Sequence, residues 1–292
     1  MTSLEAMAPA KVNLFLHVGP PKLNGRHDLD SLVVFSDERA CDYVKAEPAD
    51  EISLEVSGPF TSEAGPLSDN LVLRAALALR AASGCKAGTK LTLRKGLPVA
   101  AGIGGGSSDA AAALRLLTKL WAIDPAHAEA VAPTLGGDVP VALAGVPALM
   151  RGEGERVTPV RLPMRISALL VNPGAACPTG PVFRAHDSAG GGAAFAEIDP
   201  VPGFLDNDHL IDWLANQRND LEAPAIECVP EIGDVLGFLN AQPGVRLARM
   251  SGSGATCFAL FDAIAFAERA SAVLKSESPG WWAAPCRLGA AP

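Results

Sequence analysis

The sequence predicts an α+β fold with two lobes. Apolar residues alternate in several segments, which is typical of strands with one buried face, and other segments show helical spacing. Mixed, partly antiparallel strands accompanied by helices are typical of this class. With 292 residues and 49% hydrophobic content, the chain can form a substantial core, in one large domain or two smaller ones.

The first predicted strand covers residues 8–18, where apolar residues alternate along one face. Lys11 and Asn13 therefore project together from the opposite face. The Asn-Gly pair at 24–25 predicts a turn. We expect the partner strand over residues 32–35.

A further strand is predicted over residues 52–56, followed by a helix over 70–83 whose apolar residues share one face. Asp69 or Ser68 can cap the start of this helix, and Gly84 can end it.

A glycine-rich loop, residues 97–110 (LPVAAGIGGGSSDA), follows a predicted strand over 89–95 and leads into a helix that begins at Ser107 or Ser108. Four glycines within five residues let the backbone approach a ligand closely. Successive N–H groups and the start of a helix together form a site for an anion. This combination favours a phosphate-binding loop over a plain strand-to-helix connection.

The standard phosphate motifs do not fit this loop. A Walker A loop needs Gly-Lys-Ser or Gly-Lys-Thr, which the chain lacks. A dinucleotide fingerprint has a third glycine where this chain has Ser107.

The second half of the chain begins near Pro159 and is predicted to alternate strands and helices. The expected elements are a buried strand over 166–171, a surface loop over 188–194, two strands over 245–250 and 256–261 around a glycine turn, a helix over 263–275 and a last strand over 281–288.

Charge and composition exclude several classes of protein. The 24 basic and 32 acidic side chains give a net charge of −8, which disfavours sequence-independent binding to nucleic acid. The six cysteines form no C-x-x-C pair, and the five histidines are scattered, so we expect reduced thiols and no structural zinc. No targeting signal or membrane span is evident. We expect a cytoplasmic protein, monomeric or weakly homodimeric, with neither nucleic-acid nor membrane partners.

Four segments together resemble the GHMP kinase superfamily, which includes galactokinase, homoserine kinase and mevalonate kinase. The glycine loop resembles its ATP-binding signature, and residues 250–255 (MSGSGA) resemble its C-terminal glycine turn. Residues 9–16 (PAKVNLFL), 135–140 (LGGDVP) and His27 resemble one branch of it. The substrate of that branch is a cytidine diphosphate-linked polyol of the non-mevalonate isoprenoid pathway.

The resemblance implies an N-terminal, ribosomal-protein-like lobe over residues 1–158 that binds ATP, and a C-terminal, ferredoxin-like lobe over 159–292. It implies phosphoryl transfer from ATP to a hydroxyl of the small-molecule polyol in the cleft between the lobes, with Mg²⁺ bridging the phosphates. Homoserine or mevalonate kinase activity is the alternative. A non-catalytic binding domain would need a basic face, which the net charge of −8 disfavours. No nucleophile and base are paired in these motifs, so we expect direct in-line transfer.

The resemblance assigns catalysis to Lys11 and Asp138. Asp138 would accept the proton of the attacking hydroxyl or orient that hydroxyl. Lys11 would pair with Asp138 and offset the charge of the transition state. Considered alone, Asp138 before Val-Pro is typical of a helix N-cap, which is compatible with a catalytic role. A lone Lys on a strand, such as Lys11, is usually solvated.

The residues implied for ATP binding belong to the glycine loop and its flanks: Asn70, Lys95, Pro98, Ala101, Gly102, Gly104, Gly105, Gly106, Ser107 and Ser108. Asn70 and Lys95 would lie near the adenine and ribose. The alternative interpretation is that Asn70 is an ordinary residue at the start of a helix and that Lys95 is an exposed residue at the end of a strand. The metal ligands are not identified by the sequence: Ser108 is a candidate, and the alternative is a metal held mainly by phosphates and water.

Substrate binding is implied for Asn13, Arg26, His27, Thr179 and Phe183, together with Asp138. His27 would contact the cytosine, and Asn13 and Thr179 would hydrogen-bond the substrate. Phe183 would stack on the base, its alternative being core packing. Arg26 departs from the family pattern, which usually has a stacking Tyr, but a guanidinium plane also stacks on a base.

Overall fold

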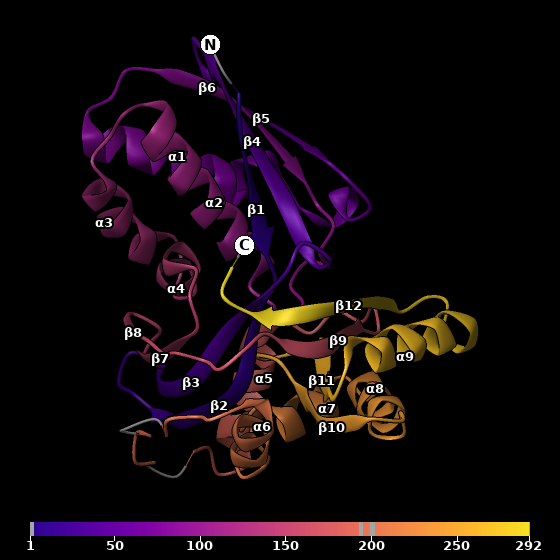
Figure 1. The fold of residues 1–292 in the computed structure, drawn as a ribbon. Coiled ribbons are helices and arrows are strands. Elements are labelled where there is room, and N and C mark those ends of the chain that lie inside the picture. Colours follow the sequence, from indigo (N-terminus) through magenta and orange to yellow (C-terminus); the bar gives the residue numbers. More distant parts are fainter. Residues whose placement is uncertain (1–2, 193–194, 199–201, 292) are drawn as a thin grey trace.

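The computed structural model describes residues 3–192, 195–198 and 202–291, and it has two lobes (Figure 1). One lobe carries helices on one side of a small sheet, and the other is built on a long sheet that runs across the lower part of the view. The predicted two-lobed α+β class is therefore confirmed.

The sheet of the upper lobe has the strand order β1-β4-β6-β5, and only the β5–β6 pairing is parallel. Three helices pack beside it, and their apolar faces form one core with the sheet. The elements of this layer are β1 (Leu4–Pro9), β4 (Cys41–Ala49), β5 (Ile52–Ser57), β6 (Gly88–Arg94), α1 (Leu71–Ser83), α2 (Gly105–Leu120) and α3 (Pro125–Leu135).

The long sheet has the order β10-β11-β9-β12-β3-β7-β8, and β2 pairs with β3. Its strands are β2 (Lys11–Pro21), β3 (His27–Ser36), β7 (Ala148–Gly152), β8 (Arg156–Pro159), β9 (Ile166–Asn172), β10 (Val245–Met250), β11 (Cys257–Phe261) and β12 (Trp282–Gly289). The last four strands in the chain lie in the spatial order β12-β9-β11-β10, the arrangement of a ferredoxin-like sheet. Because β12 pairs with β3, this sheet joins both halves of the chain.

The remaining helices connect or cover these strands. They are α4 (Val139–Ala144), α5 (Thr179–Ser188), α6 (Asn207–Ala215), α7 (Glu222–Cys228), α8 (Glu231–Asn240) and α9 (Ile264–Glu277), with short 3₁₀ turns at Thr61–Glu63 and Leu67–Asp69. In the part of the chain that is described, no helix is both long enough and apolar enough to cross a lipid bilayer.

The strand predicted over residues 8–18 is divided in the structure, since β1 ends at Pro9 and β2 starts at Lys11. The face that carries Lys11 and Asn13 is buried as fully as the apolar face. Asn13 and His17 are buried as fully as their apolar neighbours, because other elements cover both faces of β2. Alternation in the sequence therefore predicted a strand, but it did not predict how exposed the polar side chains of that strand are.

Two helix starts differ from the prediction. Helix α1 is capped by Asn70, whose Oδ1 accepts a hydrogen bond from the backbone N of Val72 (2.9 Å), rather than by Asp69 or Ser68. Helix α2 begins at Gly105, two or three residues before the predicted start at Ser107 or Ser108. The end of α1 at Gly84, in a left-handed conformation, is confirmed.

Two further predictions meet the structure only in part. The expected surface loop over 188–194 follows the end of α5 at Ser188, and its residues 193–194 lie outside the described residues. The division of the chain between 158 and 159 falls inside β8 and stays a prediction. All six cysteines are free thiols.

Candidate active site

The glycine loop between β6 and α2 packs backbone-to-backbone against the turn between β10 and β11. A Cβ atom on Gly102 would lie 2.5 Å from the carbonyl oxygen of Ser251, and one on Gly252 would lie 2.7 Å from that of Gly102. Both glycines have a positive φ, 74° and 58° respectively. A side chain at either position would therefore force the two turns apart.

Hydrogen bonds fix the glycine loop from both lobes. The Ser251 hydroxyl donates to the carbonyl of Gly102 (3.0 Å) and accepts from the backbone N of Asn13 (3.1 Å). The backbone N of Lys11 donates to Ile103 (2.8 Å). The loop is therefore set before any ligand binds.

The start of α2 presents backbone donors at this loop. The first bond of the helix runs from the N–H of Ser108 to the carbonyl of Gly104 (2.9 Å). The N–H groups of Gly105, Gly106 and Ser107 precede it and are the groups that a helix leaves for an external acceptor. Together with the helix dipole they form a site for a phosphate.

Lys11 and Asp138 form an ion pair at the mouth of the loop, with 3.0 Å between Nζ and Oδ2. Lys11 is buried, and its Nζ also donates to Oδ1 of Asn13 (2.7 Å). Asn13 is held in turn by its own Nδ2, which donates to Ser31 (2.8 Å). An ion pair and a series of hydrogen bonds therefore position the Lys11 ammonium.

Asp138 stands at the N-cap position of α4, as its sequence context predicted, but its side chain makes no capping hydrogen bond. Its side chain is 32% exposed, and the residue lines the cleft. The carboxylate is therefore available both to Lys11 and to a ligand.

These groups line one cleft of about 360 Å³ between the lobes. The predicted residues that it brings together are Lys11, Asn13, Ala101, Gly102, Gly104, Gly105, Gly106, Ser107, Asp138, Thr179 and Phe183. Thr179 also meets Ser253 across the cleft wall, with 2.9 Å between their hydroxyl oxygens.

Lys95 is buried, so the alternative of an exposed Lys at the end of a strand is wrong, and Lys95 is not among the residues that line the cleft. Its Nζ pairs with Asp42 and with Asp109, the latter at 2.8 Å, beneath the start of α2. Burial lowers the pKa of Lys95, but the two carboxylates outweigh burial, so this pKa lies above its ordinary value. Burial raises the pKa of Asp109 to about 8, against the opposing charge of Lys95. This cluster supports the loop from below.

Asn70, Pro98 and Ser108 are also absent from the residues that line the cleft. Asn70 is the cap of α1. The Ser108 hydroxyl is buried and has no hydrogen-bond partner among the described residues.

A second pocket, of about 390 Å³, adjoins the cleft and shares Leu29 and Phe183 with it. Arg26 and His27 line this pocket. The His27 and Phe183 rings lie 4.9 Å apart between centroids.

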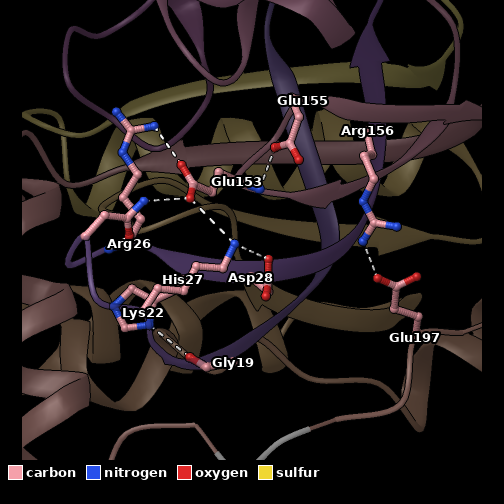
Figure 2. Close-up of polar contacts among 10 residues, drawn as sticks. Gly19, Lys22, Arg26, His27, Asp28, Glu153, Glu155, Arg156 and Glu197 are labelled. Atoms are coloured by element: carbon pink, nitrogen blue, oxygen red, sulfur yellow. Dashed lines mark hydrogen bonds and ion pairs between the residues drawn. The ribbon is translucent and has the colours of Figure 1, made fainter.

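Figure 2 shows how one wall of this pocket is tied together. Glu153, in the turn after β7, accepts from Arg26 (3.0 Å) and Asn24 (2.9 Å), and Lys22 lies 3.5 Å away. The hairpin between β2 and β3 is thus fastened to the turn between β7 and β8. The Arg26 side chain remains 69% exposed.

Comparison with known proteins identifies the family. The family model described as the GHMP kinases N terminal domain matches residues 70–146, and the one described as GHMP kinases C terminal matches residues 206–276. A protein of Hyphomonas neptunium named 4-diphosphocytidyl-2-C-methyl-D-erythritol kinase is 68% identical, over 99% of this chain and 98% of that protein. This chain belongs to the 4-diphosphocytidyl-2-C-methyl-D-erythritol kinase family.

A crystal structure of 4-(cytidine 5'-diphospho)-2C-methyl-D-erythritol kinase superposes with a TM-score of 0.77 at 35% identity, covering 98% of this chain and 99% of that one. A homoserine kinase of Cytophaga hutchinsonii has a TM-score of 0.66 at 18% identity, over 98% and 96% of the two chains, which indicates a shared fold. The sequence-based family prediction is confirmed, and the chain is an ATP-dependent kinase. The alternative of a homoserine or mevalonate kinase is not favoured.

The sequence did not reveal every residue in these pockets. Glu153 and Asp187 both line the second pocket. Asp187 follows Phe183 by four residues on α5, and that spacing could have placed both on one helix face. Glu153 lies in a turn, for which the sequence carries no comparable pattern.

Proposed function

We propose that this chain transfers the γ-phosphoryl group of ATP to the 2-hydroxyl of 4-diphosphocytidyl-2-C-methyl-D-erythritol. The observation that carries the proposal is the Lys11–Asp138 ion pair (3.0 Å), which lines the same cleft as the glycine loop and the start of α2. A phosphate site and a carboxylate for the acceptor hydroxyl are therefore next to each other.

Asp138 is proposed to orient the acceptor hydroxyl and take up its proton. Its carboxylate suits this role because it makes no capping bond and lines the cleft. Lys11 is proposed to hold Asp138 and to offset the negative charge that develops on the transferring group. Asn13, which fixes the Lys11 ammonium, also lines the cleft and is proposed to hydrogen-bond the polyol.

The glycine loop is proposed to hold the phosphates of ATP. Gly104, Gly105 and Gly106 line the cleft without side chains, so a phosphate can approach the backbone N–H groups at the start of α2. The Ser107 hydroxyl lines the same wall and can donate to a phosphate oxygen.

The residues present fit a Mg²⁺ ion held mainly by phosphates and water. No cluster of three acidic, histidine or cysteine side chains suited to a metal occurs among the residues that the structure describes. The buried Ser108 hydroxyl, which has no partner among those residues, is the protein oxygen proposed for the metal. When bound, Mg²⁺ would neutralise charge on the phosphates.

The second pocket is proposed to take the cytosine. Phe183 lines both the cleft and this pocket, so one ligand can extend from the phosphate loop to the second pocket. Phe183 and the Arg26 guanidinium offer planar surfaces on which a base stacks. Thr179 is proposed to hydrogen-bond the part of the substrate that links the two regions.

The position of the new phosphate in the product tests this proposal. Purified protein would be incubated with ATP, Mg²⁺ and the diphosphocytidyl substrate, and the product analysed by ³¹P and ¹³C NMR. We expect one new phosphoester, coupled to the methyl-bearing carbon 2. A phosphoester on another carbon, or ADP formed without an organic phosphoester, would refute the proposal.

The transfer is proposed to be direct, because no nucleophile paired with a base was found in the sequence motifs. Incubation with γ-labelled ATP alone should leave the protein unlabelled, and a labelled protein would contradict direct transfer. Action in the cytoplasm, as a monomer or weak homodimer, without nucleic-acid or membrane partners, stays a prediction.

A further inference from the structure

Arg115 lies on α2, the helix whose start is proposed to hold the phosphates, and its side chain reaches the end of α4. Its Nη1 donates to the carbonyl oxygen of Ala142 (2.8 Å) and to that of Leu143 (3.5 Å). Asp138 stands at the opposite end of α4, which has only six residues. Arg115 therefore joins the helix proposed to bind ATP to the helix that carries the proposed catalytic carboxylate.

Two partners account for the carbonyl groups at the end of α4. The carbonyl of Val141 accepts from the backbone N of Gly145 (3.0 Å), which closes the helix in a left-handed conformation. The carbonyls of Ala142 and Leu143 are among those that the end of a helix leaves without an internal partner. Arg115 supplies their donor, and its positive charge is favourable at the negative end of the helix dipole.

Ala142 links Arg115 to the backbone of Asp138. Its C=O accepts from Arg115 (2.8 Å), and its N–H donates to the carbonyl of Asp138 (3.1 Å). The Asp138 side chain makes no capping hydrogen bond, so its backbone and its contact with Lys11 (3.0 Å) determine where the carboxylate lies. A shift of α4 would therefore move the carboxylate as well.

The position of α4 depends on such contacts, because a helix this short is not stable by itself. Ala111, one turn before Arg115 on α2, packs with Val141 and Ala142 in one buried cluster that also holds residues of β3 and β7. Burial lowers the pKa of Arg115, and among the described residues no carboxylate offsets this effect. Removing a cation from water costs free energy unless hydrogen bonds compensate, and here the carbonyls of α4 are the compensating groups.

We propose that Arg115 is a positioning residue for phosphoryl transfer, which fixes α4 so that the Asp138 carboxylate stays beside Lys11 and the acceptor hydroxyl. The inference rests on the proposed function, since it takes Asp138 to orient that hydroxyl. Arg115 is not among the residues that line the cleft, so it acts through Asp138 and not by contact with a substrate.

Arg115→Met is the first test, because methionine has a similar preference for helices but no hydrogen-bond donor. A displacement of about 1 Å at a reacting centre costs up to ~100-fold in rate, so loss of this anchor should lower kcat about tenfold. The KM values for ATP and for the diphosphocytidyl substrate should stay within about twofold of the wild type, because the start of α2 and the pocket walls remain. A wild-type kcat, or a loss that appears only in KM, would overturn the inference.

Lys119→Met is the matched control. Lys119 lies one turn further along α2, is exposed, and lines the same surface hollow beside β1 as Arg115. Its kcat should equal that of the wild type, and a fall equal to that of Arg115→Met would assign the effect to lost positive charge and overturn the inference. Arg115→Gln, with the same expected loss of kcat, replaces the Met form if that form fails to fold.

A double-mutant cycle tests whether Arg115 acts through Asp138. In an Asp138→Ala background, adding Arg115→Met should change the remaining kcat by less than about twofold, because the carboxylate that Arg115 positions is already absent. A further fall of about tenfold in this background would mean that Arg115 acts elsewhere, and would overturn the inference. Absence of diphosphocytidyl substrate turnover in the wild type would instead refute the proposed function, and the inference with it.

Discussion

A methyl group added at Gly104 is predicted to displace Lys11, one member of the catalytic pair. Gly104 has φ of +58°, and a Cβ at this position would lie 3.0 Å from Cε and 3.2 Å from Cβ of Lys11. Atoms at such distances must move apart by several tenths of an ångström. In Gly104→Ala the Lys11 ammonium therefore leaves its position 3.0 Å from Asp138.

The size of the effect follows from two separate costs. The left-handed conformation costs alanine about 1 kcal/mol of folding stability relative to glycine, roughly 2–4 °C in the melting temperature. A displacement of about 1 Å at a reacting centre costs up to ~100-fold in rate, so several tenths of an ångström should lower kcat about tenfold. The KM for ATP should change little, because the backbone donors of α2 remain.

Gly84→Ala separates these two costs. Gly84 ends α1 with φ of +68°, and a Cβ there would meet nothing within 4 Å. Both variants should lose similar stability in calorimetry, while only Gly104→Ala should lose kcat in a coupled ADP-release assay. A kcat of Gly104→Ala within twofold of the wild type would refute the link between the loop and Lys11.

Three further predictions address the site. Asp138→Asn should lower kcat by at least ~100-fold while calorimetric ATP affinity stays the same; a small loss would remove Asp138 from the chemical step. Arg26→Ala should raise the KM for the diphosphocytidyl substrate about tenfold and leave the KM for ATP unchanged, whereas an unaltered substrate KM would mean that Arg26 does not contact the base. The pKa of Asp109 is raised from 3.8 to about 8, so the folded protein binds the extra proton between these values. This group's contribution to stability is therefore lost as the pH rises through that window, by at most ~1.4 kcal/mol per unit, and Asp109→Asn should flatten the pH dependence of the unfolding free energy. Parallel pH profiles for the two proteins would contradict this.

The parts of the fold that local patterns specify were predictable. The alternation in β5, the shared apolar face of α1 and the glycine loop before α2 each depend on residues close in sequence. The pairing of Lys11 with Asp138 was also predicted, but only through the resemblance of two motifs 127 residues apart, since nothing local relates them.

The errors arose where distant segments decide the environment. Lys95 follows β6, and the alternative of an exposed side chain is wrong because it pairs with Asp42 and Asp109 beneath α2. Both faces of β2 are buried, including His17 as well as Lys11 and Asn13, which alternation along the strand did not predict. The contact between His27 and Asp187 also joins distant segments, and so no sequence pattern predicted it.

The most direct test of the account is a comparison of substrates. ADP release by the purified protein with ATP and Mg²⁺ would be measured with 4-diphosphocytidyl-2-C-methyl-D-erythritol, its uridine analogue, homoserine and mevalonate. The account predicts rapid turnover of the cytidyl substrate, much slower turnover of the uridine analogue and none of the other two. Turnover of homoserine or mevalonate without the cytidyl substrate would contradict it.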